Sequence, residues 1–110
     1  MEGSLELYYE VLLRMDYNSI LRLILQTRSN HQIYDLLLKV FKDNSFWYRK
    51  LSQEIKTFYD PSVDWLRAYK FLEGGLTTQK MIDAAKNGYL DELELLILNG
   101  VDPWSIRYTN

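Results

Sequence analysis

One segment near the C-terminal end limits what this chain can fold into. Residues 84–103, AAKNGYLDELELLILNGVDP, have the pattern of a helix–turn–helix unit, in which Gly88 and Gly100 close two short helices. A single unit of this kind cannot bury its apolar side alone, and arrays of such units usually need about three copies. The chain must therefore cover this unit with something else, which we expect to be the helices predicted within residues 44–72.

Apolar residues recur at helical spacing along the rest of the chain, and no segment alternates as a half-buried strand would. Asp16, Asn30 and either Thr77 or Thr78 are suited to begin helices. The sequence therefore predicts an all-α single domain of about seven short helices. The expected helices cover residues 5–15, 19–26, 30–41, 45–59, 62–73, 78–88 and 90–99.

Composition narrows the class of protein. The 110 residues include no cysteine, which excludes disulfides, thiolate metal sites and cysteine nucleophiles. No apolar run reaches the roughly 18 residues that a membrane span needs. The first ten residues, MEGSLELYYE, are acidic where a signal peptide would be basic. We therefore expect a protein of the cytoplasm or nucleus that is not secreted and binds no membrane.

The helix–turn–helix segment resembles an ankyrin repeat. It matches the family pattern of Ala-Ala, Asn-Gly-Tyr, Leu-Leu, Asn-Gly and Asp-Pro, in that order. It departs from the family at residues 78–81, TQKM, where ankyrin repeats have Thr-Pro-Leu-His. The resemblance implies that residues 76–110 form one repeat, preceded by connecting helices over residues 43–75.

Residues 5–33 are similar to an F-box, with Leu5, Val11-Leu12, Met15-Asp16, Ile20 and Leu23 at its motif positions. The usual Leu-Pro opening is Leu5-Glu6 here. The later segments KDNSFWYRKL and DWLRAYKFL resemble the region that follows F-box-like segments in ankyrin proteins of large DNA viruses. This implies F-box-like helices over residues 1–42 and a setting in the host cytoplasm or nucleus, or in the virion.

These resemblances support two hypotheses about protein partners. In the first, the chain is a small viral structural or host-interaction protein whose open repeat side forms a homodimer. The residues predicted for that self-association face are Leu93, Leu96, Ile97, Trp104, Ile106 and Tyr108. In the second, implied by the F-box resemblance, the chain recruits a Skp-type ubiquitin-ligase adaptor. The residues predicted to be partly exposed on that adaptor face are Leu5, Leu12, Asp16 and Ile20.

A third hypothesis, nucleic-acid binding, comes from the charge distribution. Residues 38–70 carry seven cations against four carboxylates, whereas both flanking segments are acidic. Aromatic rings lie among these cations, a mixture that can stack bases and neutralise phosphates. Helical periodicity favours instead a core that contains Trp47 and Trp65 with cations on its solvent side. The candidate cations are Arg49, Lys50, Lys56, Arg67 and Lys70.

The sequence gives little reason to expect an enzyme, a metal or a cofactor. His31 is the single histidine, and its pairing with Asp35 supplies at most half of a metal site. Neither a phosphate loop nor a nucleophile elbow is present. Asp91, Glu92 and Glu94 begin a helix, where negative charge is favourable, and we interpret them as a solvated face. The sequence therefore predicts a non-enzymatic interaction protein without catalytic residues.

Overall fold

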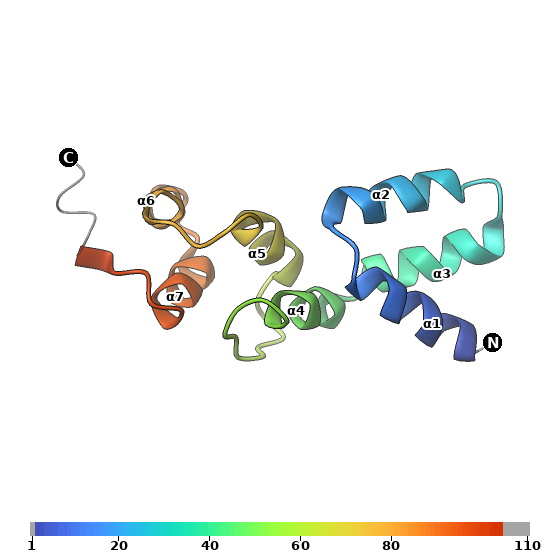
Figure 1. Ribbon diagram of the computed structural model, residues 1–110, viewed down its shortest axis with the longest axis horizontal. Coiled ribbons are helices and arrows are strands. Elements are labelled where there is room, and N and C mark those ends of the chain that lie inside the picture. The colour runs from blue at the N-terminus through green and yellow to red at the C-terminus, as the bar shows by residue number, and fades with distance from the viewer. Residues whose placement is uncertain (1, 105–110) are drawn as a thin grey trace.

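The computed structural model describes residues 2–104, which form seven α-helices and no strand (Figure 1). The all-α prediction is therefore confirmed for these residues. Ile106 and Tyr108, predicted for the self-association face, lie outside the described residues. The helices are α1 (Glu2–Leu13), α2 (Tyr17–Gln26), α3 (His31–Phe41), α4 (Asn44–Ser52), α5 (Trp65–Leu72), α6 (Thr78–Asn87) and α7 (Leu90–Leu98).

The helices follow one another along an elongated molecule of 53 × 24 × 21 Å. Figure 1 shows α1 to α3 at one end, α4 and α5 in the middle, and α6 and α7 at the other end. Helix α4 packs mainly on α5 and α6 mainly on α7, while α5 also contacts α7. The C-terminal helix pair is therefore covered on one side by the preceding pair, as the sequence predicted.

Side-chain caps begin α2, α3 and α6 where the sequence predicted them, whereas α5 begins at Trp65 after the cap Asp64 and not at residue 62. The Asp16 carboxylate accepts a hydrogen bond from the Ser19 amide at 3.2 Å, and the Asn30 side chain accepts one from Ile33 at 3.3 Å. Thr77 caps α6 in the same way, accepting from Lys80 at 3.1 Å. Such bonds satisfy amides that have no partner within the helix, so they fix where each helix begins.

The prediction for residues 45–59 is wrong in its second half. Helix α4 ends at Ser52, and Phe58, which would continue the apolar stripe of Trp47 and Leu51 in a longer helix, is 42% exposed. From residue 53 the chain instead forms a loop, and its backbone is hydrogen-bonded by a residue that is distant in the sequence. Asn99 accepts a hydrogen bond from the Lys56 amide at 2.7 Å and donates one to the Lys56 carbonyl at 2.9 Å. These bonds replace the helical ones that periodicity alone had suggested.

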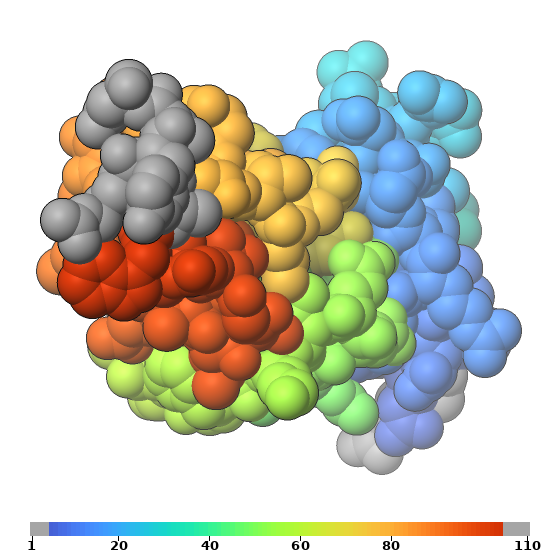
Figure 2. Space-filling view, turned by 60° about the vertical axis from the view of Figure 1, so that its left-hand side comes forward, coloured from blue at the N-terminus to red at the C-terminus, as the bar shows by residue number. Residues whose placement is uncertain are grey.

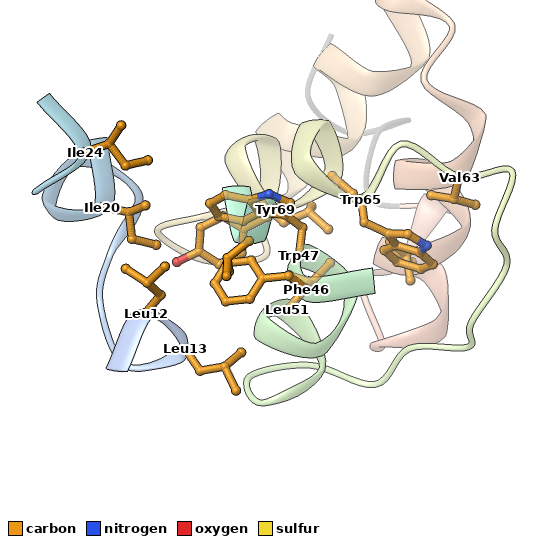
Figure 3. Close-up of a cluster of buried hydrophobic side chains, with 14 of the residues drawn as sticks. Leu12, Leu13, Ile20, Ile24, Phe46, Trp47, Leu51, Val63, Trp65 and Tyr69 are labelled. Atoms are coloured by element: carbon orange, nitrogen blue, oxygen red, sulfur yellow. The ribbon is translucent and has the colours of Figure 1, made fainter. Parts of the chain in front are cut away.

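The core is continuous through the molecule and is centred on Trp47, which is 1% exposed (Figure 3). Four aromatic rings from four helices lie with their centroids 4.9–6.2 Å from a neighbouring ring of this group, and all contact Trp47. We call this group the Trp47 ring cluster; it comprises Tyr17, Phe41, Phe46, Trp47 and Tyr69. The indole N–H of Trp47 donates to the Phe41 carbonyl at 2.7 Å. The cluster joins α2, α3, α4 and α5, so it connects the N-terminal end of the molecule to its middle.

Replacing Trp47 by Phe tests the importance of this cluster. The smaller ring leaves a void and the Phe41 carbonyl loses its donor, so we expect the free energy of unfolding to fall by about 2 kcal/mol. Urea unfolding followed by circular dichroism measures this change. The matched control is Trp104→Phe, because Trp104 is 62% exposed, and we expect a change below about 0.5 kcal/mol. Equal effects of the two substitutions would contradict the central role of Trp47.

Candidate interaction surfaces

Helix α7 carries a stripe of exposed apolar side chains on the side away from the core. Leu90 is 69% exposed, Ile97 50% and Leu98 45%. These residues are spaced at i, i+7 and i+8, which places them on one face of the helix together with the exposed Glu94. We call Leu90, Ile97 and Leu98 the α7 stripe. Figure 2 turns this end of the molecule toward the viewer, with α7 in orange-red.

The structure corrects the predicted self-association face. Ile97 and Trp104 are exposed as expected, but Leu96 is fully buried and Leu93 is half-buried against the core. Helical spacing could have separated these residues, because Leu96 shares its side of α7 with the buried Leu95 and Glu92. Leu90 and Leu98, which the sequence analysis did not select, belong to the exposed face instead.

The predicted adaptor face does not form one accessible surface. Leu12 and Ile20 are fully buried in the core, and Leu5 is half-buried, so the expected partial exposure of the first two is wrong. Asp16 is exposed, but its carboxylate is engaged as the cap of α2. The F-box-like spacing selects residues that bury one side of α1 and of α2 in the core, because apolar periodicity marks the buried side of a helix.

The five candidate nucleic-acid cations point to different places. The Arg49 guanidinium lies 5.3 Å from the centre of the Tyr9 ring, and the Lys70 ammonium lies 4.8 Å from that of Tyr17. Lys56 belongs to the loop after α4, and Lys50 is buried. Arg67 and Lys70 line one surface depression, whereas Lys56 and Arg49 line two others. The structure therefore does not bring these cations together as one basic surface.

Arg67 and Glu92 form an ion pair that joins α5 to α7. Two guanidinium nitrogens of Arg67 donate to the two carboxylate oxygens of Glu92, Nε at 2.8 Å and Nη2 at 3.2 Å. Glu92 is fully buried, so its assignment to a solvated face is wrong. The same guanidinium lies 4.6 Å from the centre of the Tyr89 ring. The pair fixes how the C-terminal helix pair lies against α5.

We expect Glu92→Gln to lower the free energy of unfolding by about 2 kcal/mol. The amide keeps the shape of the side chain but replaces a charge-assisted bidentate interaction with at most one weaker hydrogen bond. Chemical denaturation at neutral pH measures the loss. Glu94→Gln makes the same chemical change at an exposed position of the same helix and should alter stability by less than about 0.5 kcal/mol. If both variants unfold alike, the pair has no special role.

Lys50 is a buried cation at the junction of α1 and α4, and it is 5% exposed. Its ammonium donates to the Leu13 carbonyl at 3.1 Å, so it satisfies a backbone acceptor at the end of α1, and it lies 5.2 Å from the centre of the Tyr69 ring. Burial lowers the pKa of Lys50 from its ordinary value, an effect that Glu54 and two other carboxylates oppose. Burial also raises the pKa of Tyr69. The hydrogen bond of Lys50 therefore links α4 to the end of α1.

The lowered pKa of Lys50 gives a pH-dependent prediction. Between the folded-state pKa and the ordinary value of 10.5, the unfolded chain binds more protons than the folded chain, so stability contributed through Lys50 rises with pH. The stability of the unaltered protein minus that of Lys50→Met should therefore increase as the pH rises toward 10.5. Urea unfolding at a series of pH values measures this difference. A difference that stays constant or falls would contradict the assignment.

The described residues contain no group of three or more side chains that could together hold a metal ion. His31 and Asp35 are both exposed on α3. None of the described helices has the length and apolar character that crossing a membrane requires. No family model, curated protein sequence or solved structure matched the chain. The surfaces themselves are therefore the basis for any functional proposal.

Proposed function

We propose that this chain is a non-enzymatic protein–protein interaction module that self-associates through the α7 stripe. The observation that carries the proposal is the row of exposed apolar side chains Leu90, Ile97 and Leu98 on the last helix of the stack. When a partner covers apolar side chains on one helix face and removes them from water, the free energy of the complex is lowered. Trp104 is also exposed and lies shortly after this helix.

Stacked helix pairs favour a partner of their own kind at an uncovered end. Helix α5 covers one side of the C-terminal pair, and the α7 stripe lies on a side that no other described helix covers. A second copy can supply the missing apolar surface through a two-fold arrangement in which each stripe packs on the other. In such a homodimer, the α7 stripes of the two copies cover each other, so no other protein is needed to bury them.

The adaptor hypothesis has less support. Binding a Skp-type adaptor through Leu12 and Ile20 would require α1 and α2 to leave the core, because both side chains are fully buried in it. The resemblance to F-box and ankyrin proteins of large DNA viruses would put a self-associating module of this kind in the cytoplasm or nucleus of a host cell. That setting rests on the resemblance alone.

Size-exclusion chromatography with light scattering tests the proposal. We expect a mass twice the 13.2 kDa of one chain. Ile97→Gln combined with Leu98→Gln should give a monomer with an unchanged circular dichroism spectrum, because both side chains are exposed in the single chain.

The matched control is Leu7→Gln with Leu25→Gln, which removes two equally exposed leucines from α1 and α2 and should leave the dimer intact. A monomeric unaltered protein, or a dimer that survives the α7 substitutions, contradicts the proposal. Co-elution of a monomer with an added Skp-type adaptor would favour the alternative.

A further inference from the structure

A groove with a mixed apolar and cationic lining runs along α5. One depression of about 400 Å³ is lined by Asp64, Leu66, Arg67, Lys70, Phe71 and Tyr89. A second of about 230 Å³ shares Asp64 and Leu66 with the first and extends to Phe41, Lys42 and Trp47. The two depressions adjoin at these shared residues, and we call them together the α5 groove. It does not include the α7 stripe.

The charges around the α5 groove are predominantly positive and incompletely compensated. Lys42 and Lys70 are exposed, and neither lies within ion-pair distance of a carboxylate of the described residues. The carboxylate of Asp64 is engaged as the cap of α5, where it accepts from the Arg67 amide at 3.1 Å. Arg67 is paired with Glu92, yet its side chain stays 42% exposed. An occupant with carboxylates would therefore meet unpaired ammonium groups.

The aromatic rings of the groove are poorly placed for stacking nucleic-acid bases. The Tyr89 ring faces the Arg67 guanidinium, and the Tyr17 ring behind Lys70 faces that ammonium. Trp47 is 1% exposed, so its ring is not available to a ligand. Single-strand binders depend on open ring faces together with a charged track. Leu66 and Phe71, which are half-buried, offer instead an apolar floor for aliphatic side chains.

We propose that the α5 groove is a docking site for an acidic amphipathic segment of a partner protein. Apolar side chains of that segment pack on Leu66 and Phe71, and its carboxylates pair with the ammonium groups of Lys42 and Lys70. Charge complementarity of this kind guides encounter and fixes the register of the bound segment. The site is separate from the self-association surface, so a dimer can bind two such segments.

A fluorescein-labelled peptide, Glu-Leu-Glu-Glu-Phe-Leu-Glu-Glu, provides the probe, and its counterpart has lysine in place of every glutamate. We expect fluorescence anisotropy to show binding of the acidic peptide only, weakened by added salt. In amide NMR spectra of the protein, the acidic peptide should shift the signals of Leu66, Lys70 and Phe71. Lys42→Glu with Lys70→Glu should weaken binding by about tenfold or more.

Arg28→Glu with Lys86→Glu is the matched control, since it makes the same change in net charge at exposed positions outside the groove. The control variant should bind the acidic peptide as the unaltered protein does, and so should the Ile97→Gln and Leu98→Gln variant, whatever its oligomeric state. Absence of binding, equal binding of the basic peptide, or equal weakening in the control variant overturns the proposal. Shifts of the same α5 signals by a single-stranded oligonucleotide, but not by the acidic peptide, also overturn it.

Discussion

The packing of aromatic rings around Trp47 is the interaction on which the rest of the structure depends. In an elongated stack of short helices, the helices of the N-terminal end must be joined to those of the middle. The Trp47 ring cluster provides that junction, because its rings come from α2, α3, α4 and α5 and all contact one indole. Large rings bury much apolar area per residue and lose little side-chain entropy, which suits a cross-section with room for few side chains.

Two buried charges determine how neighbouring parts of this stack are oriented. Lys50 connects α4 to the last turn of α1, and Glu92 connects α7 to Arg67 of α5. Apolar contacts tolerate small rotations, but a buried charge loses its partner when the helices rotate, and an unpaired buried charge is costly. We infer that these two interactions select one arrangement among several that would bury similar apolar area.

The same architecture explains why the candidate surfaces are at the periphery. A stack of helix pairs leaves exposed the sides that face no neighbouring pair, and among the described helices the α7 stripe lies on such a side. It also leaves a groove wherever successive pairs meet, and the α5 groove lies between α4, α5 and the start of α7. Both proposed activities are binding at these surfaces, and neither requires a chemical step.

The sequence by itself determined the helical class, the order of the helices and most of their starting points, because apolar spacing and capping residues act within a few residues of one another. It also identified Trp47 and Trp65 as core residues. Only the tertiary structure decided which charges are buried and which apolar residues are exposed. The sequence predicts that Glu92 and Lys50 are solvated, but both are buried, because Arg67 and Leu13, which are distant in the sequence, supply their partners. In the same way, the loop after α4 is bonded by Asn99, 43 residues beyond Lys56, an interaction that no local sequence pattern contains.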